Sequence, residues 1–277
     1  MTIEYDNIAD IGPARAKCPV LRILASVPSH LETEHRDLRP GTLRRSVTLL
    51  RAFRAEQTDP DHFYGLLARD SVRQLGQYTG LAGRLVLDVG GGPGYFGTEF
   101  RRAGARYLTV DSDLGELSAR GVPQAGCVIG SGMALPVQSR SVDVCYSSNV
   151  LEHVPHPERM ADEMVRVTRP GGAVFLSYTT WLSPWGGHET APWHYLSGDY
   201  AARRYQRRHG RPPKNRYGQS LFPLSAARML RWARRHPQAR LVAAVPRYHP
   251  SWARWLVCLA GIREVAVWNL LLVLQRR

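Results

Sequence analysis

The amino-acid sequence predicts an α/β fold with a mostly parallel sheet and helices on both of its faces. Between residues 84 and 179, apolar runs of strand length alternate with segments of helical period. Short glycine turns join these segments, which is the pattern of βαβ units in a parallel sheet. A chain of 277 residues is long enough to bury one large core. We therefore expect a single α/β domain with additions to it.

Two helices are expected before the first core strand. The first is marked by apolar residues at helical spacing, namely Leu43, Val47 and Leu50. The second begins with Asp59 as its N-cap and Pro60 at its first position. Residues 1–40 carry several prolines and no sustained period, so we expect an N-terminal extension of undefined order before a domain at 41–277.

Five strands follow, with helices between them. The expected strands are RLVLDV, RYLTVD, CVIG, VDVCYSS and GAVFLSYT, and the helix in PERMADEMVRVT is expected to end at the Pro-Gly-Gly of residues 170–172. After Tyr178 the period is lost in an aromatic and arginine-rich stretch, residues 181–223, which we interpret as a substrate-binding insertion. Regularity returns in a helix with one apolar face, formed by Ala226, Met229, Leu230 and Ala233.

The last expected elements are two strands with a helix between them. The strands are RLVAAVPRY and VAVWNLLLVLQ, and the helix is SWARWLVCLAGI. Its apolar face would consist of Trp252, Trp255, Leu256 and Leu259. Such a face either packs on the sheet or rests on a membrane surface, with arginines toward anionic headgroups. Packing on the sheet is favoured because ordinary core helices have the same period.

The glycine-rich turn after the first strand predicts a cofactor site. Gly92, Gly94 and Gly97 form the GxGxxG pattern that is typical of dinucleotide-binding turns. Asp88 argues against a dinucleotide, because a carboxylate at this strand end would repel a pyrophosphate. The same carboxylate would favour the ammonium and sulfonium groups of S-adenosylmethionine. We therefore expect S-adenosylmethionine, with an NAD(P)-dependent oxidoreductase as an alternative.

Later motifs connect the chain with a known family. LDVGGGPG, VDSD, GSGMALPVQSRSVDVCYSSNVLEHV and RVTRPGGAVFLSYT resemble the successive motifs of class I S-adenosylmethionine-dependent methyltransferases. More narrowly, residues 41–277 resemble a group of uncharacterised actinobacterial methyltransferases. The resemblance implies a Rossmann-like, mostly parallel seven-stranded sheet with a final antiparallel strand.

The resemblance also implies which residues hold each part of the cofactor. The methionine part would lie near Asp88, Gly90, Gly92 and Gly94, and Asp111 would hold the ribose, with Ser112 beside it. The adenine would be flanked by Ser131, Gly132 and Met133, and the cofactor would also be lined by Ser147 and Asn149.

Two histidines of the insertion are the candidate catalytic residues. His188 and His194 follow the fifth strand, on the side of the sheet where the cofactor is expected. An alcohol acceptor loses its proton near the transition state, and histidine is the usual base near neutral pH. Either histidine could instead hold an aromatic lid by local hydrogen bonds, with Glu189 as an orienting partner. His153 is interpreted as part of the scaffold.

The expected acceptor is a small molecule, a sugar or a lipid-linked intermediate, methylated on oxygen. The aromatic residues of the insertion would either wall its pocket or cover a sheet edge; they are Trp181, Trp185, Trp193, Tyr195 and Tyr200. The formal charge of +14 comes almost wholly from arginine, and a basic cluster lies within residues 203–216. That cluster makes an RNA or protein methyltransferase the alternative, although no Asn-Pro-Pro-Tyr motif follows the fourth strand.

Cysteine usage and the N-terminal residues bear on location. The four cysteines are widely spaced and indicate neither a disulfide framework nor a metal site. Residues 1–10 are acidic and have no signal-peptide pattern. We expect a cytoplasmic protein without a metal, and a peripheral contact with the membrane stays open.

Overall fold

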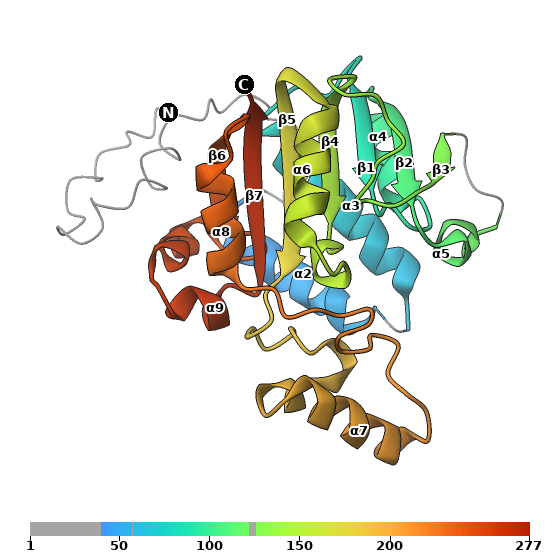
Figure 1. Ribbon diagram of the computed structural model, residues 1–277, viewed down its shortest axis with the longest axis vertical. Helices are drawn as coiled ribbons and strands as arrows, with labels where there is room; N and C mark the ends of the chain where they lie inside the picture. The colour runs from blue at the N-terminus through green and yellow to red at the C-terminus, as the bar shows by residue number, and fades with distance from the viewer. Residues whose placement is uncertain (1–39, 57, 122–125) are drawn as a thin grey trace.

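The structure of the protein, a computed structural model, describes residues 40–56, 58–121 and 126–277. Its centre is a seven-stranded sheet in the order β3-β2-β1-β4-β5-β7-β6 (Figure 1). The first five strands are parallel, and β7 runs antiparallel to both β5 and β6. This confirms the predicted Rossmann-like sheet. The expected extension, residues 1–40, lies outside the described residues except for Pro40.

The strands match the apolar runs of the sequence. They are β1 (Leu85–Val89), β2 (Arg106–Asp111), β3 (Cys127–Ile129), β4 (Val142–Ser148), β5 (Thr168–Thr179), β6 (Ala239–Pro246) and β7 (Asn269–Arg276). Central strands have continuous apolar runs because helices cover both of their faces. Val86 of β1 lies between Tyr107 of β2 and Val144 of β4, so these three strands end at one edge of the sheet.

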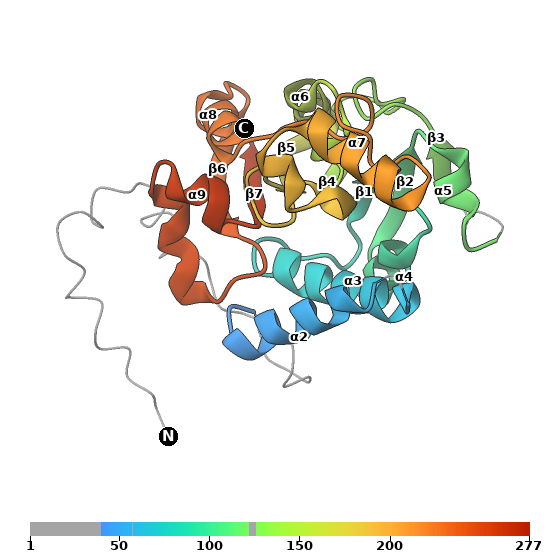
Figure 2. The same cartoon turned by 90° about the horizontal axis from the view of Figure 1, so that it is seen from below.

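Two helical layers enclose the sheet (Figure 2). One layer contains α6 (Pro157–Val167) and α8 (Ala226–Arg235), and the other contains α3 (Pro60–Gly76) and α4 (Tyr95–Arg102). The predicted apolar face of α8 is buried at all four positions. The helix α6 ends at Val167, three residues before Pro170, because Thr168 already pairs with Val142 of β4. Two shorter helices are α5 (Leu114–Ser118) and α9 (Ile262–Ala266).

A buried ion pair joins the first two helices. The helix α2 (Leu43–Arg54) precedes α3, which has the predicted Asp59 cap and Pro60 at its start. The Arg45 side chain donates to both carboxylate oxygens of Asp70, at 2.5 and 2.7 Å, and both side chains are 1% exposed. Arg45 also donates to the Arg247 carbonyl at 3.0 Å, so the pair connects α2 and α3 to the end of β6.

The segment between β5 and α8 lies beyond the carboxyl ends of the parallel strands (Figure 1). It contains two 3₁₀ turns, His188–Thr190 and Trp193–Tyr195, and the helix α7 (Gly198–His209). The Ser197 hydroxyl caps the start of α7, and Gly210 ends it with a φ of +69°. The arginine-rich stretch is therefore helical, and its arginines 203, 207 and 208 are exposed.

The prediction of an amphipathic α-helix at residues 251–262 is wrong in the type of helix and in the face that is buried. Ser251–Cys258 forms a 3₁₀ helix, in which Ala253 and Val257 are buried. Trp252, placed on the apolar face by the sequence, is 68% exposed, because three residues per turn rotate the side chains away from the α-helical pattern. Cys127 and Cys145 are free cysteines. Within the described ranges, no helix is long and apolar enough to cross a bilayer.

Candidate functional site

The turn after β1 has the backbone conformation that favours glycine. Gly90, Gly92 and Gly94 have φ values of +79°, +51° and +84°. A Cβ atom on Gly90 would lie 2.5 Å from the Val150 side chain, whereas one on Gly92 would meet no heavy atom within 4 Å. The backbone at Gly92 is therefore uncovered, and a ligand can approach it closely. This geometry fits the cofactor that the sequence implies.

Asp88 lies beneath this turn with its carboxyl group removed from water. The side chain is 1% exposed, and the Tyr107 hydroxyl donates to its Oδ2 at 2.7 Å. Burial raises the pKa of Asp88 to about 7, although the hydrogen bond from Tyr107 opposes this shift. A buried carboxyl of this kind gains from an approaching cation, because an opposite charge favours its ionised form.

Asp111 stands at the end of β2 and is half-buried. Its Oδ2 accepts a hydrogen bond from the Gly92 backbone at 3.0 Å, and its Oδ1 accepts one from the Asp113 backbone at 3.0 Å. Each carboxylate oxygen keeps a second lone pair, so the group can still accept hydrogen bonds from ribose hydroxyls. Ser112 is exposed beside it.

The remaining residues expected near the cofactor differ in how accessible they are. Ser131, Gly132 and Met133 are half-buried in the loop after β3, where the Ser131 hydroxyl accepts from the Met133 backbone at 3.2 Å. Ser147 is fully buried and donates to the Val89 carbonyl at 2.8 Å. It fixes β4 against β1 and presents no exposed group. Asn149, with a φ of +57°, accepts from Asn269 at 2.7 Å.

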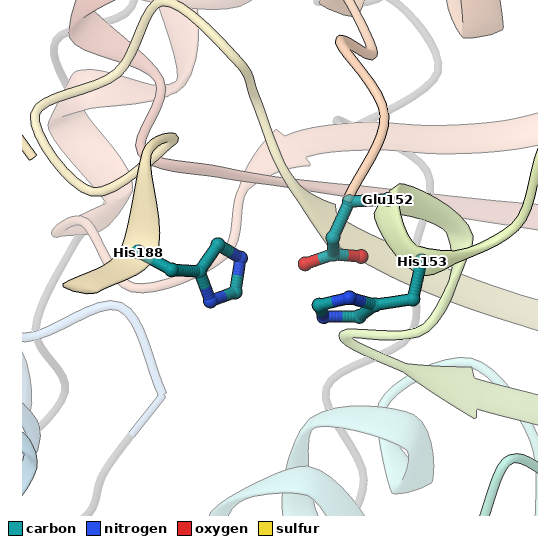
Figure 3. A group of neighbouring side chains, drawn as sticks. All are labelled: Glu152, His153 and His188. Carbon is teal, nitrogen blue, oxygen red and sulfur yellow. The ribbon is translucent and has the colours of Figure 1, made fainter. Parts of the chain in front are cut away.

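His188 belongs to a cluster with two residues that follow β4 (Figure 3). We call Glu152, His153 and His188 the EHH cluster. One potential ligand atom of each lies within 4.8 Å of the others. Figure 3 shows the three side chains pointing toward one another, with the first two from the 3₁₀ turn Leu151–His153 and the third from the insertion.

Two buried polar atoms of the EHH cluster have no hydrogen-bond partner in the described structure. Glu152 is 1% exposed, and its Oε1 accepts from the Thr179 backbone at 2.9 Å. Its Oε2 and the Nε2 of His188 are buried and have no hydrogen-bond partner in the described structure. Burial lowers the pKa of His188, against the opposing charge of Glu152, and favours its neutral ring.

The second candidate histidine, His194, is placed differently. It is 2% exposed, its Nε2 lies 3.2 Å from the Ser183 carbonyl, and its ring packs edge-on against Trp181. A Cβ atom on Gly187 would lie 2.5 Å from its Nδ1, so His194 fills the space directly behind the backbone that carries His188. Glu189 makes no hydrogen bond to either histidine in the described structure; its two oxygens accept from the backbone and the side chain of Asn215, each at 2.8 Å.

The aromatic residues of the insertion contact both the core and one another. Trp185 meets Phe53 of α2 edge-on, with ring centroids 5.1 Å apart, and also contacts Trp268. Trp193 is 38% exposed and lies under the guanidinium of Arg204. The insertion is thus anchored on α2 at one end and open to solvent at the other.

Two functional features were missed from the sequence. Glu152 was not singled out, since a lone acid beside His153 carries no motif. Arg247 was missed as well, although it is fully buried and donates to the hydroxyls of Ser71, Tyr146, Ser148 and Ser177. It thereby joins α3 to the carboxyl ends of β4 and β5. In both cases the partners lie far away in the chain, so no local pattern reveals them.

Known methyltransferases resemble this chain in sequence and in fold. A family model described as a methyltransferase domain matches residues 87–176. An uncharacterized methyltransferase of Mycobacteroides abscessus is 54% identical over 250 residues, which cover 86% of this chain and 96% of the relative. Among solved structures, an S-adenosylmethionine-dependent methyltransferase from Mesorhizobium loti is 19% identical with a TM-score of 0.51, covering 76% of this chain and 98% of its own.

A geranyl diphosphate methyltransferase solved in complex with S-adenosylmethionine has a similar fold. It is 15% identical, with a TM-score of 0.50 over 88% of this chain and 95% of its own. At such identities the likeness concerns the fold, whereas the mycobacterial relative is 54% identical over 86% of this chain. The cofactor is S-adenosylmethionine, which decides against the NAD(P) alternative. The chain belongs to the same family as its mycobacterial relative and is a class I S-adenosylmethionine-dependent methyltransferase.

Proposed function

We propose that this enzyme methylates a hydroxyl oxygen of a small molecule, a sugar or a lipid-linked acceptor in the cytoplasm. The observation that carries the proposal is the EHH cluster, which gathers lone pairs without donors just beyond the glycine turn. Val150, two residues before Glu152, lies against Gly90, so the cluster is attached directly to the turn. An acceptor hydroxyl that reaches this place meets groups able to take part in removing its proton.

The chain's own residues divide into three tasks. The glycine turn, Asp88 and Asp111 would hold the cofactor, which supplies a methyl group activated by a sulfonium when it is bound. The EHH cluster would orient the acceptor hydroxyl and help to remove its proton, so His188 is the histidine that we assign to catalysis. His194 supports the backbone at Gly187, and we assign it a positioning role.

The insertion at 181–223 would cover the acceptor. The ring contact between Trp185 and Phe53 anchors the insertion on α2. A cover fixed at this point would exclude water from the transfer step.

The test is a transfer assay with methyl-labelled S-adenosylmethionine and an extract of the producing cells. The extract is then separated into lipid, glycan, small-molecule, RNA and protein fractions. Label in one of the first three fractions supports the proposal, provided that the labelled product carries a methyl ether. The His188→Gln variant should transfer at least about tenfold less label, whereas His209→Gln, an exposed change on α7, should transfer as much as the wild type.

The exposed arginines of α7 support one alternative, an RNA or protein acceptor. Arginines 203, 207 and 208 lie on this helix together with Arg204, whose guanidinium lies over the Trp193 ring. Such a surface binds polyanions with a steep salt dependence. Label in RNA or protein that falls sharply with added salt would contradict the small-molecule proposal and make α7 the acceptor-binding surface.

A further inference from the structure

The EHH cluster has the composition of a metal site. Two imidazoles and one carboxylate lie with ligand atoms within 4.8 Å of one another, on two segments that are 35 residues apart in the chain. This donor set is typical of sites for divalent transition metals, including zinc sites with three protein ligands. Zinc–ligand bonds of about 2.1 Å need donor atoms about 3.4 Å apart, so the three groups have to approach one another by up to about 1.4 Å.

The hydrogen bonds around His153 leave one of its nitrogens free for a ligand. Its Nδ1 lies 2.7 Å from the Ser220 carbonyl, and a carbonyl oxygen only accepts, so Nδ1 carries the proton. The lone pair of the neutral ring is therefore on Nε2. A hydrogen bond from the second ring nitrogen to a backbone carbonyl is the usual arrangement for a metal-ligating histidine.

The other two members have buried polar atoms that no group in the described structure satisfies. The Nε2 of His188 and the Oε2 of Glu152 have no hydrogen-bond partner, and Glu152 makes no salt bridge with any described residue. Glu152 is 1% exposed. Buried polar groups are usually paired, and a buried carboxylate needs a cation or a set of donors. One cation between the three residues satisfies all of these groups together.

The position of the EHH cluster in the fold favours a metal site with one open coordination position. Glu152 and His153 come from the turn after β4, and His188 comes from the insertion that covers the same edge of the sheet (Figure 3). Three protein ligands leave room for at least one further oxygen ligand. His188 also has a φ of +48°, which places its ring on the cluster side at some backbone cost.

We propose that Glu152, His153 and His188 bind one divalent transition-metal ion, for which Zn²⁺ and Co²⁺ are suitable probes. This replaces the expectation of a protein without a metal. The occupancy of the site is independent of the proposed O-methylation. Only the role of the ion rests on that function. In this role the ion would hold the acceptor oxygen and make the proton of the acceptor hydroxyl more acidic.

The test measures metal binding without an acceptor. Tag-free, full-length protein is stripped with a chelator and titrated with Co²⁺, whose visible absorption reports nitrogen and oxygen ligands in a site of low symmetry. We expect one equivalent to bind, and Zn²⁺ to displace it. His188→Gln and Glu152→Gln should each weaken binding by more than about tenfold, whereas His209→Gln, an exposed histidine outside the cluster, should bind as the wild type does.

Two outcomes would overturn this site. The first is the absence of a visible band at high micromolar Co²⁺, and the second is equal affinity in the wild type and in His188→Gln. His188 begins a short 3₁₀ turn of the insertion, outside the sheet, so its variant stays informative even if Glu152→Gln fails to fold. Circular dichroism monitors the folding of both variants. Failure of the label-transfer assay with metal binding intact would contradict the proposed acceptor class and leave the metal site standing.

Discussion

At the scale of single residues, the raised pKa of Asp88 predicts that cofactor binding depends on pH. Its pKa of about 7 means that the carboxyl is largely protonated at mildly acidic pH. We expect the ammonium group of the cofactor to pair with the ionised carboxylate, so binding below this pKa would release a proton and would be weaker.

We therefore expect the affinity for S-adenosylhomocysteine, which keeps the ammonium group, to rise about tenfold between about pH 6 and pH 8. Isothermal titration calorimetry in buffers of different ionisation enthalpy would show the affinity and the released proton. Asp88→Asn should bind more weakly at the higher pH and lose this dependence. A wild-type affinity that does not change over this range would contradict the role of Asp88.

The two glycines of the turn should respond differently to alanine. Gly92→Ala places a methyl group in open space, at a backbone cost of about 1–2 kcal/mol from its positive φ. Gly90→Ala has the same strain and also a clash with Val150 at 2.5 Å. We expect Gly92→Ala to reduce S-adenosylhomocysteine affinity by more than about tenfold with modest destabilisation, since the ligand approaches there. We expect Gly90→Ala to be much less stable in urea unfolding. Equal loss of stability in both, with normal affinity in Gly92→Ala, would mean that the cofactor does not approach this backbone.

At the scale of elements, the Arg45–Asp70 pair connects α2 and α3 and reaches the end of β6. Removing one partner of a buried pair leaves a charge that water does not solvate. Asp70→Asn should therefore reduce the free energy of unfolding by about 3–5 kcal/mol, measured by urea denaturation.

The matched control is Glu116→Gln, which breaks the pair of Glu116 with Lys214 at 3.0 Å, where Lys214 is 81% exposed. Exposed pairs of this kind contribute about 1 kcal/mol or less. If the two variants lost similar stability, the internal pair would not be what fastens α2 to the domain.

At the scale of the whole molecule, the insertion and α2 come together at Trp185, although about 130 residues separate Trp185 from Phe53. Trp185→Ala removes the edge-on contacts with Phe53 and Trp268. We expect amide hydrogen exchange across residues 181–223 to accelerate about tenfold, which corresponds to roughly 1.4 kcal/mol of lost aromatic contact.

Trp193→Ala is the control for this prediction, because Trp193 is 38% exposed and contacts residues of its own segment. Its exchange pattern should change only near α7. Uniformly slow exchange in Trp185→Ala would show that the insertion is held by other contacts.

The sequence by itself determined the sheet, its helical layers and the cofactor. Strand and helix periods, the glycine turn and Asp88 act over a few neighbouring residues, and a local pattern is enough to recognise them. The predicted face of α8 and the cap of α3 are correct for the same reason. The 3₁₀ helix at Ser251–Cys258 is the exception, because apolar spacing does not distinguish 3.0 from 3.6 residues per turn over a short segment.

Only the tertiary structure decided which polar side chains meet. His188 and His194 were equivalent in the sequence, yet one joins Glu152 and His153 while the other supports a backbone. Arg247 likewise finds four hydroxyls from three separate elements. Such clusters form when strands and loops distant in the chain end at one edge of the sheet. Their energies depend on burial and on distances across space, and neither quantity is encoded in the spacing of residues along the chain.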